Sequence, residues 1–246
     1  MAMISKFPEK FVPYRSRTGT QELKKQLYFS FYSRLSDFIV SKRKKQGSGY
    51  FTFRNKEFSY LIHSYNLAWN NERTVEVPIV IDFLKSNRSK NNKILEFGSV
   101  LRHYTKPDWV ILDKFEKYPG VINKDVIDLE EQNKYDLIIS ISTLEHVGLD
   151  DVNNPEKILK AIKVLQAALK PGGQAMITIP IGYNIFLDKK IFASALEFSS
   201  VYFLKRRDKN NHWQQVTADE IKDCQYDHPF YCANAIAICY YKKSNP

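Results

Sequence analysis

The sequence predicts an α/β fold, in which a mostly parallel sheet of seven strands carries helices on both of its faces. Two observations predict this fold. Short apolar segments and a helical segment alternate from residue 93 onward, and the segment YDLIISIS (135–142) is apolar almost throughout. A nearly continuous apolar run is typical of a central parallel strand, because helices cover both sides of such a strand.

Seven segments after residue 93 have the apolar and β-branched composition of strands. They span residues 94–97, 109–112, 121–122, 135–142, 174–179, 201–204 and 235–241. The fourth segment gives the strongest signal and the third the weakest, because only two apolar residues form the third. The spacing between these segments favours a mostly parallel order.

One helix is predicted between the fourth and fifth strands, over residues 154–170. Asn154 suits the N-cap position, Pro155 the first helical position and Glu156 the first turn. Apolar residues then recur at helical spacing as far as Leu169. The following Lys-Pro-Gly-Gly segment (170–173) is expected to end the helix and to turn the chain into the fifth strand.

Residues 1–90 have a different character and predict an N-terminal helical extension that packs on the sheet domain of residues 91–246. Residues 21–41 are expected to form a helix, and residues 58–84 a second one in which Pro78 begins a new turn. Gly47-Ser48-Gly49 separates the two helices. The apolar residues of the first helix lie on one stripe: Leu23, Leu27, Phe31, Leu35 and Phe38.

The composition limits the classes of protein that fit. The net charge is +10, and it is spread along the chain apart from short basic runs at residues 42–45 and 205–207. A lysine-rich surface is therefore favoured over a dedicated nucleic-acid interface, although a basic surface suits anionic partners. No run approaches the roughly 20 apolar residues of a membrane span. The start of the chain lacks the apolar centre of a signal peptide, so a cytoplasmic location is expected.

Three cysteines, Cys224, Cys232 and Cys239, are an odd number without the paired spacing of a metal site. We expect reduced, structural thiols and no metal site.

Glycine and aspartate stand at the ends of the first two predicted strands, in a Rossmann-like arrangement. Gly98 follows the first strand and Asp113 the second. In open parallel sheets ligands bind beyond the carboxyl ends of the strands, where a carboxylate suits the two hydroxyls of a ribose. Ser99, Val100 and Leu101 follow Gly98, so the further glycines of a dinucleotide fingerprint are missing. An adenosine ligand without phosphates, such as S-adenosylmethionine, fits this pattern better than a dinucleotide.

The chain resembles class I S-adenosylmethionine-dependent methyltransferases in several motifs over residues 93–180. Glu96-Phe97-Gly98-Ser99 is similar to the first motif of that family in degenerate form, and DLIISISTLEH (136–146) is similar to its fourth-strand motif. The Lys-Pro-Gly-Gly turn also matches. The resemblance implies S-adenosyl-L-methionine as cofactor, with S-adenosyl-L-homocysteine as product. The cofactor-binding residues that it implies are Glu96, Gly98, Ser99, Asp113, Lys114, Asp125, Val126, Ser142 and Thr143.

Each of these positions also has a plainer interpretation. Gly98 could be a turn glycine, Asp113 a solvated acid or helix cap, and Asp125 a cap. Ser142 and Thr143 could cap a helix.

His146 is the favoured catalytic base, and Glu145 the residue that orients it. O-methylation removes a proton from a hydroxyl, and a histidine with a near-neutral pKa serves that purpose. A packed structural histidine, with Glu145 in an ion pair, is the alternative. His103 and His63 are further base candidates.

The substrate-binding residues expected are Trp69, Arg73, His103, Tyr183 and Asn184. Tyr183 and Asn184 follow the fifth strand, where turn-forming residues would be the alternative. For Glu72, Arg73 and Glu76 the alternative is a surface salt-bridge network, because these residues have helical spacing.

The segments YNLAWNNERTVEVPIV (65–80) and PIGYN (180–184) resemble a group of bacterial methyltransferases, some of which lie with genes for surface polysaccharides. The resemblance implies O-methylation of a sugar or sugar-nucleotide hydroxyl in capsular polysaccharide biosynthesis, with a small anionic acceptor. A homodimer is an open alternative to a monomer.

Two other classes stay open. A nucleic-acid methyltransferase is disfavoured, because no (D/N)-P-P-Y motif follows the fourth strand. A non-catalytic partner subunit is compatible with the degenerate first motif.

Overall fold

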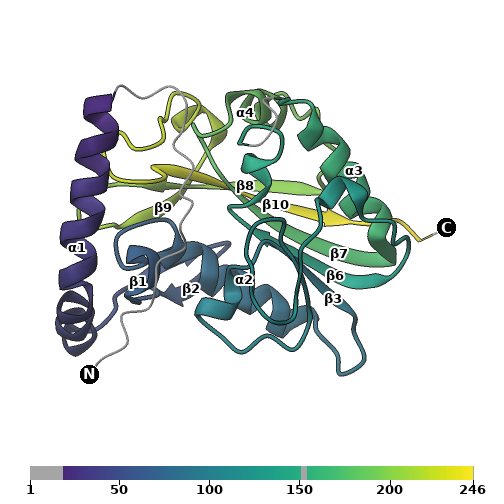
Figure 1. Ribbon diagram of the computed structural model, residues 1–246, viewed down its shortest axis with the longest axis horizontal. Coiled ribbons are helices and arrows are strands. Elements are labelled where there is room, and N and C mark those ends of the chain that lie inside the picture. Colours follow the sequence, from purple (N-terminus) through teal and green to yellow (C-terminus); the bar gives the residue numbers. More distant parts are fainter. Residues whose placement is uncertain (1–18, 151–153, 246) are drawn as a thin grey trace.

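The central sheet of the computed structural model has eight strands, in the order β5-β4-β3-β6-β7-β10-β8-β9 (Figure 1). The structure describes residues 19–150 and 154–245. The strands are β3 (Ile94–Phe97), β4 (Val110–Leu112), β5 (Val121–Ile122), β6 (Tyr135–Ile141), β7 (Leu169–Pro180), β8 (Ser200–Arg206), β9 (Trp213–Val216) and β10 (Ala235–Lys242). All seven predicted strands are therefore present.

Five strands run parallel and three pairings are antiparallel. Strands β5, β4, β3, β6 and β7 form the parallel part, while β10 pairs antiparallel with both β7 and β8. The parallel strands follow the order 3-2-1-4-5 of a Rossmann-like fold, whose switch point lies between β3 and β6. The α/β prediction is thus confirmed.

The predicted number of seven strands is wrong, because the edge strand β9 is an eighth. Its sequence, Trp-Gln-Gln-Val, has two exposed glutamines at its centre. It therefore lacks the apolar alternation that predicts a strand.

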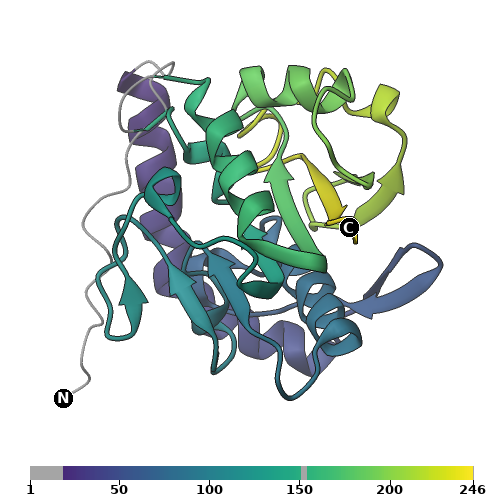
Figure 2. The same cartoon turned by 90° about the vertical axis from the view of Figure 1, so that its right-hand side faces the viewer.

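Helices cover both faces of the sheet, as predicted. Figures 1 and 2 show α2 (Arg73–Asn87) on one face and α3 (Lys157–Ala168) with α4 (Ile185–Phe192) on the other. Side chains of β10 alternate between the two apolar clusters: Ala237 and Cys239 face α3, whereas Ile236 and Ile238 face α2. This period of two is what a strand buried on both faces requires.

The long helix α1 (Gly19–Gln46) stands upright beside the sheet in Figure 1 and confirms the predicted N-terminal helix. It packs through Val40 and Tyr32 against Ile62 and Trp69.

The predicted stripe of α1 does not make this contact. Leu27, Phe31, Leu35 and Phe38 are 62%, 60%, 40% and 72% exposed, and the side chain of Leu23 lies outside the described residues. The helical spacing predicted one apolar stripe on α1. The face of α1 that packs against the rest of the chain is a different one, and it includes Ser36.

The predicted helix over residues 58–84 is wrong in its first half. A hairpin of β1 (Tyr50–Phe53) and β2 (Lys56–Ser59) occupies this region, followed by a short 3-10 turn, η1 (Tyr65–Leu67). Arg54 and Asn55 form the hairpin turn with φ of 51° and 60°. Two positive φ values are typical of the two-residue turns that join antiparallel strands.

Pro78 lies inside α2, where a missing backbone N–H normally costs stability. The carbonyl that this N–H would have bound is that of Thr74, four residues earlier. It accepts a hydrogen bond from Leu61 N at 2.9 Å instead. The loop before η1 therefore satisfies the group that the proline leaves open.

The helix predicted over residues 154–170 is shorter, as α3 begins at Lys157 and ends at Ala168. Asn154 caps a preceding turn, in which its Oδ1 accepts from Glu156 N at 3.2 Å. The Lys-Pro-Gly-Gly segment lies within β7, at an irregularity in its pairing with β6, rather than in a turn before the strand. Gly172 N donates to Lys243 O, which explains how this segment stays in the sheet.

Helix α2 packs in the same apolar cluster as side chains of β3 and β6, so residues before the predicted boundary near residue 90 contribute to the core of the sheet. The division into two domains stays a prediction. Residues 1–18 of the extension lie outside the described part. No helix among the described residues is long and apolar enough to cross a membrane.

Candidate active site

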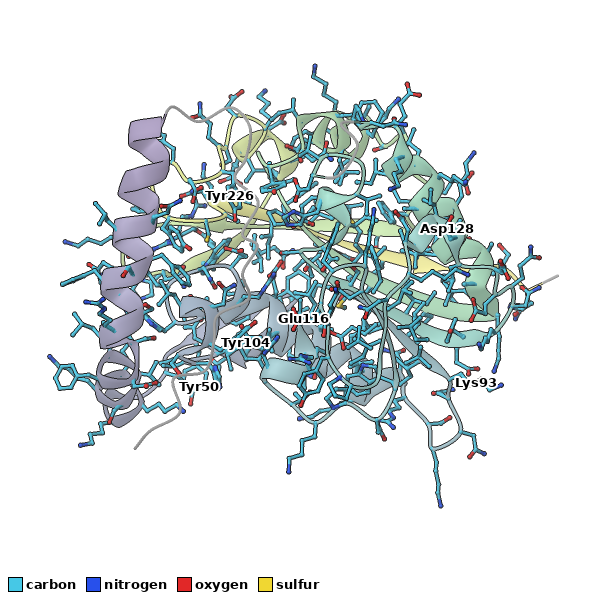
Figure 3. All side chains as sticks on the ribbon, in the orientation of Figure 1. Tyr50, Lys93, Tyr104, Glu116, Asp128 and Tyr226 are labelled. Carbon is cyan, nitrogen blue, oxygen red and sulfur yellow. The ribbon has the colours of Figure 1, made fainter. Side chains whose placement is uncertain are left out.

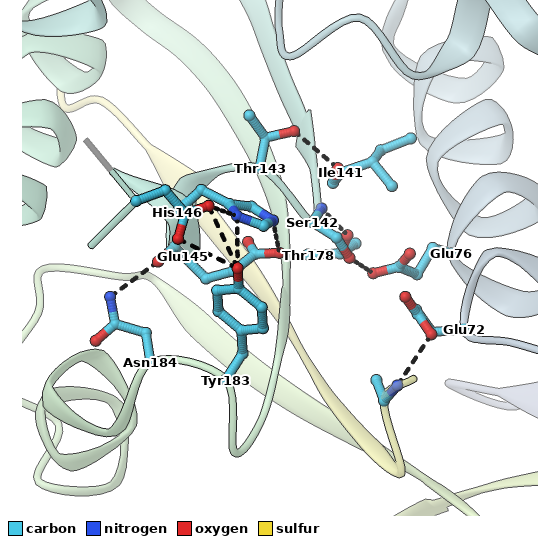
Figure 4. A network of polar contacts seen from close by, with 12 residues as sticks. Glu72, Glu76, Ile141, Ser142, Thr143, Glu145, His146, Thr178, Tyr183 and Asn184 are labelled. Carbon is cyan, nitrogen blue, oxygen red and sulfur yellow. Dashed lines mark hydrogen bonds and ion pairs between the residues drawn. The ribbon is translucent and has the colours of Figure 1, made fainter. Parts of the chain in front are cut away.

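The carboxyl ends of β3 and β6 meet at the switch point of the sheet, where ligands bind in this type of fold. Gly98 follows β3 and Ser142 follows β6. Ser142 has φ of 38°, an unusual backbone conformation for a residue with a side chain, which costs about 1–3 kcal/mol. Its Oγ donates to Glu76 Oε1 at 2.6 Å, and its N donates to Thr178 O at 3.0 Å (Figure 4). The surrounding contacts therefore hold a strained residue in place.

Gly98 and Thr143, two predicted cofactor residues, touch one another. A Cβ on Gly98 would lie 2.1 Å from Thr143 Oγ1, and Gly98 has φ of 92°. Both the backbone conformation and the space therefore require glycine here. Thr143 Oγ1 donates to Ile141 O at 3.0 Å, which fixes the side chain over the glycine.

Glu96 shapes the loop after β3 from within. Its Oε1 accepts from Val100 N at 2.9 Å and Leu101 N at 2.7 Å, and its Oε2 accepts from Trp109 Nε1 at 2.9 Å. Burial raises the pKa of Glu96, although these hydrogen bonds oppose the shift. The carboxylate is thus committed to the loop that carries Gly98 and Ser99.

Asp113 lies beside this loop, as predicted for a strand-end acid. Its Oδ2 accepts from Ser99 N at 3.1 Å, so the ends of β3 and β4 are joined. Its Oδ1 accepts from Phe115 N and Glu116 N, both at 2.8 Å. Three backbone amides thus orient this carboxylate, and one of its oxygens has a single protein donor.

Lys114 and Asp125, both predicted to bind cofactor, pair with each other. Asp125 Oδ2 lies 3.0 Å from Lys114 Nζ and 2.6 Å from Lys157 Nζ, and its Oδ1 accepts from Ile127 N. Burial raises the pKa of Asp125, but the two lysines lower it further, to below its ordinary value. The neighbouring Val126 is buried in the core.

Arg73 is buried between carboxylates and is not part of a surface network, which corrects the alternative considered for this segment. The Arg73 guanidinium donates to Glu76 Oε2 and lies 3.5 Å from Ser142 O. Glu72, also buried, lies beside Arg73 and accepts a hydrogen bond from Ala233 N at 3.1 Å. Burial lowers the pKa of Arg73, but Glu76 and Glu72 raise it overall. Burial raises the pKa of Glu72, although Arg73 opposes the shift, so this carboxyl group is protonated more readily than an exposed one.

His146 forms the centre of a hydrogen-bonded cluster beside Ser142 (Figure 4). Its Nδ1 lies 2.5 Å from Asp150 Oδ2 and 2.9 Å from Tyr183 OH, and its Nε2 lies 3.6 Å from Glu145 Oε1. The side chain is 42% exposed. Burial lowers the pKa of His146, but the hydrogen bond to Asp150 raises it above its ordinary value.

Glu145 is buried, and its Oε2 has no hydrogen-bond partner. Burial raises the pKa of Glu145 to about 8 despite the opposing effect of His146. The group is therefore mostly protonated at neutral pH. Its backbone O accepts from Asn184 Nδ2 at 2.9 Å, and Asn184 also caps α4 through Leu187 N. Asn184 thus has the turn-forming position that was its alternative.

The other predicted site residues, His103, His63 and Trp69, contact groups other than His146. His103 stacks on Tyr65 with ring centroids 3.7 Å apart, and His63 packs against Tyr104. Burial, and then the charge of Arg102, lowers the pKa of His103 to about 4. Burial also lowers the pKa of His63. Both are therefore weaker bases than His146. Trp69 packs on α1 and donates from Nε1 to Ser36 Oγ at 2.9 Å.

Asp150 and Glu76 are parts of the site that sequence reasoning missed as functional residues. Asp150 follows His146 by four residues, a spacing that places two side chains of a helical turn together, and this signal was present in the sequence. Glu76 reaches Ser142 from another element, and nothing in the sequence connects the two. Among the described residues no group of three or more histidine, cysteine, aspartate or glutamate side chains could hold a metal ion.

Several buried polar atoms in β6 and in the segments after β3 and β6 have no hydrogen-bond partner among the described residues, a situation that usually indicates a ligand or water. They include Ser99 Oγ, Arg102 Nη1 and Tyr104 OH after β3, Ser140 Oγ within β6, and Glu145 Oε2 after β6. The residues present thus fit a polar ligand that spans the ends of β3 and β6.

No protein-family profile matches the chain, and no curated protein sequence matches it. Many solved structures do, among them S-adenosylmethionine-dependent methyltransferases. One, described as a possible histamine N-methyltransferase from Thermotoga maritima, has 12% identity and a TM-score of 0.40, covering 66% of this chain and 87% of that chain.

A TehB-like S-adenosylmethionine-dependent methyltransferase from Corynebacterium glutamicum has 18% identity and a TM-score of 0.40, covering 66% of this chain and 85% of its own. The N-methyltransferase NodS from Bradyrhizobium japonicum, in complex with S-adenosyl-L-homocysteine, has 13% identity and a TM-score of 0.43, covering 70% and 87%. At these identities and TM-scores the similarity carries no argument about the activity of this chain.

Proposed function

We propose that this chain is an S-adenosylmethionine-dependent O-methyltransferase that acts on a hydroxyl of a sugar or sugar nucleotide. The observation that carries the proposal is the His146–Asp150 pair at the carboxyl edge of the sheet, beside the strained Ser142. A partly exposed histidine whose Nδ1 is held by a carboxylate is oriented to accept a proton at Nε2.

S-adenosylmethionine, when bound, supplies a methyl group whose bond to sulfur breaks, with the electron pair staying on sulfur, as the bond to the acceptor oxygen forms. The chain's own residues manage the proton. His146 Nε2 takes it from the acceptor hydroxyl, and Asp150 stabilises the resulting imidazolium through Nδ1–H. Tyr183 OH, 2.9 Å from Nδ1, holds the ring in place. Positioning supplies much of the rate in such an in-line displacement.

The acids near Ser142 support a ligand without phosphates. Glu76 pairs with Arg73 and accepts a hydrogen bond from Ser142 Oγ, and Glu72 lies beside Arg73. Acidic side chains at the end of β6 suit a sulfonium better than the pyrophosphate of a dinucleotide. The loop after β3 also lacks the glycines that cradle a pyrophosphate.

In this proposal the loop of Gly98 and Ser99, together with Asp113, holds the nucleoside. Within residues 19–150 and 154–245, Ser99 Oγ has no hydrogen-bond partner and Asp113 Oδ2 has one donor, so both can bind hydroxyls. Lys114, Asp125 and Val126 line the neighbouring strand ends, while Ser142 and Thr143 face the methionine end. Glu96 acts indirectly by shaping the loop.

The role in surface polysaccharide biosynthesis rests on the resemblance of residues 65–80 and 180–184. The acceptor in this proposal is small and anionic, which suits a net charge of +10. Tyr183 and Arg73 are the substrate residues nearest to His146 and Ser142. Cytoplasmic location, where such activated sugars would be available, belongs to the same proposal.

A homodimer is also part of the proposal, and it would cover the exposed stripe of α1. Leu27, Phe31 and Phe38 are each at least 60% exposed on one helix. Antiparallel pairing of two copies would place the basic ends, which contain Arg43 to Lys45, at opposite ends of the pair. Light scattering should give twice the chain mass, and Phe31→Ser with Phe38→Ser should halve it. A monomeric unmodified chain would contradict the dimer.

Calorimetric titration of the full chain with S-adenosyl-L-homocysteine, with NAD as control, tests the proposed function. We expect micromolar binding of the first and none of the second. Failure to bind would favour the non-catalytic partner subunit. Transfer of labelled methyl groups to sugar nucleotides should follow, and transfer to RNA or DNA instead would favour the nucleic-acid methyltransferase.

A further inference from the structure

A cavity of about 360 Å³ lies on the other side of the segment that carries Arg73, and none of the residues that line it touches His146 or Asp150. The volume falls within the roughly 300–1,000 Å³ of small-molecule sites. Its walls come from the end of α1, the loop before β1, the β2–α2 segment and the loop between β8 and β9.

Arg43 is the charged group of this cavity. Its Nη1 donates to Trp69 O at 2.9 Å, and its guanidinium lies 4.8 Å above the Trp69 ring. Burial lowers the pKa of Arg43. Among the described residues no carboxylate forms an ion pair with it. A guanidinium that is partly removed from water without a counter-ion favours an anion as its neighbour.

A glycine-containing loop in the cavity wall suits a phosphorylated ligand. The loop Gly47-Ser48-Gly49 lines the cavity with positive φ at both glycines, 87° and 69°, and a side chain on Gly47 would meet no atom within 4 Å. Its backbone is therefore open to close approach by a phosphate.

Aromatic rings form the other part of the wall. Tyr60 and Trp69 lie inside, whereas Tyr50 is 64% exposed at the rim, beside the lower end of α1 in Figure 3. An exposed ring beside a cation offers a stacking surface to a nucleobase. Asp208, beside the lining residue His212, is occupied by His212 Nδ1 at 2.7 Å and by Asn210 N.

The cavity and the His146 cluster lie at one edge of the sheet and are connected through hydrogen bonds of Asn71. Asn211, on the cavity side, donates to Asn71 O at 2.9 Å, and Asn71 Oδ1 accepts from Arg73 N. The loop of Asn211 follows the carboxyl end of β8, three strands from β6. Three strand spacings amount to about 14 Å, so only an elongated ligand could occupy both places.

We propose that this cavity binds the nucleoside diphosphate part of the acceptor, with Arg43 and the Gly47-Ser48-Gly49 loop at the phosphates and Tyr50 at the base. This inference rests on the proposed function and specifies its substrate class as a nucleoside-diphosphate-linked sugar.

Calorimetry of the full chain at 0.15 M salt tests the proposal with ADP, GDP, CDP, UDP and dTDP as probes. We expect at least one of them to bind with a micromolar Kd, and inorganic pyrophosphate to bind more weakly. Arg43→Gln should weaken nucleotide binding at least tenfold. Tyr50→Ala, at an exposed position, should weaken it about fivefold while leaving pyrophosphate binding unchanged.

Lys45→Gln is the matched control, because it removes one positive charge from the same turn of α1 without changing the cavity wall. It should alter the Kd less than twofold. The proposal is overturned if no nucleoside diphosphate binds, if Arg43→Gln has no larger effect than the control, or if a single-stranded oligonucleotide binds more tightly than every probe.

Titration with S-adenosyl-L-homocysteine in the same preparation separates the two possible failures. Its binding without nucleotide binding overturns the cavity alone. Nucleotide binding that responds to Arg43→Gln, without binding of S-adenosyl-L-homocysteine, supports the cavity and counts against methyl transfer.

Discussion

His146 stands between two acids that do different things to it. Asp150 bonds its Nδ1 at 2.5 Å, whereas Glu145, 3.6 Å from its Nε2, is mostly protonated at neutral pH. The first partner fixes the ring and the second adds little negative charge near the nitrogen that would accept a proton. This asymmetry makes Nε2 the reactive atom in the proposed chemistry.

Replacing His146 should therefore lower turnover without loss of cofactor. We expect His146→Ala to reduce kcat about 10²–10⁴-fold, the usual contribution of general base catalysis. Its affinity for S-adenosyl-L-homocysteine should stay within twofold, as measured by calorimetry. Unchanged turnover would remove His146 as base and return His103 to consideration.

Asp150→Asn tests the orienting role through the pH dependence of kcat/KM. Asp150 raises the pKa of His146, and catalysis requires the neutral ring, so the activity of the natural chain should rise above neutral pH. Without the carboxylate the pKa falls, and the acidic limb of the profile should move to lower pH while kcat decreases. A profile that does not move would show that Asp150 has only a structural effect.

Glu145 gives a prediction about stability. Its pKa is about 8 in the folded chain and 4.5 as its ordinary value, so the folded state binds this proton more tightly. The contribution to stability is therefore fully present below pH 4.5 and is lost as pH rises towards 8.

Glu145→Gln should remove this loss of stability with rising pH, because a glutamine side chain has no carboxyl proton to release. We expect the variant to gain stability over the natural chain between pH 5 and 8, by a few kcal/mol at about 1.4 kcal/mol per pKa unit. Urea unfolding at several pH values measures it. A difference that is constant with pH would contradict the raised pKa.

At the residue scale the sequence predicted much of this cluster. The motif around residues 136–146 placed Ser142, Glu145 and His146 at one strand end, and the structure brings them together with Tyr183. It did not predict Asp150 or the burial of Arg73 with Glu76. Those contacts join separate elements, and pairings of that kind leave no periodic signal in a single sequence.

At the scale of elements, the junction after β3 depends on one glycine. Gly98 combines φ of 92° with a threonine side chain that fills the space of a Cβ. We expect Gly98→Ala to destabilise the fold by about 2–3 kcal/mol, through backbone strain and overpacking together. Thermal unfolding measures this loss.

A second substitution separates the two causes. Thr143→Gly removes the clash but leaves the strain, so Gly98→Ala should cost less stability in the Thr143→Gly variant than in the natural chain. No loss of stability in that variant would mean that the backbone conformation at Gly98 costs nothing.

Strands were easier to predict than the region before residue 73. Strands such as β3 and β6 have the apolar run that their burial requires. The hairpin of β1 and β2 was missed although Phe51, Phe53 and Phe58 alternate around a two-residue turn. The apolar residues of η1 and of the loop before it have a spacing close to that of a helix, which led to the wrong prediction. Asn66 and Leu67 have positive φ values that interrupt a helix, and the sequence did not predict them.

At the scale of the whole molecule, the direction of β8, which matches that of the five parallel strands, places both candidate sites on one edge. Ser142 and Asn211 follow β6 and β8, which run in the same direction although β10 between β7 and β8 runs the other way. The sequence predicted the class of fold. It did not predict that the loops after β6 and β8 lie at the same edge, because strand order is set by packing between distant segments.

The antiparallel strand β10 also carries a thiol at its centre. Cys239 is buried, and burial raises its pKa; Cys232 is buried as well, whereas Cys224 is half-buried, with a pKa also raised by burial. The thiolate is the form that attacks an alkylating reagent, so burial and the raised pKa both protect Cys239.

Iodoacetamide should therefore label the native chain at Cys224 first and at Cys239 at least a hundredfold more slowly, as followed by mass spectrometry of peptides. Equal rates would contradict the burial of β10. Since the side chain of Cys239 faces the layer of α3 and α4, labelling of Cys239 requires that layer to move away from the sheet. The alkylation rate of Cys239 therefore measures how often this face of the sheet opens.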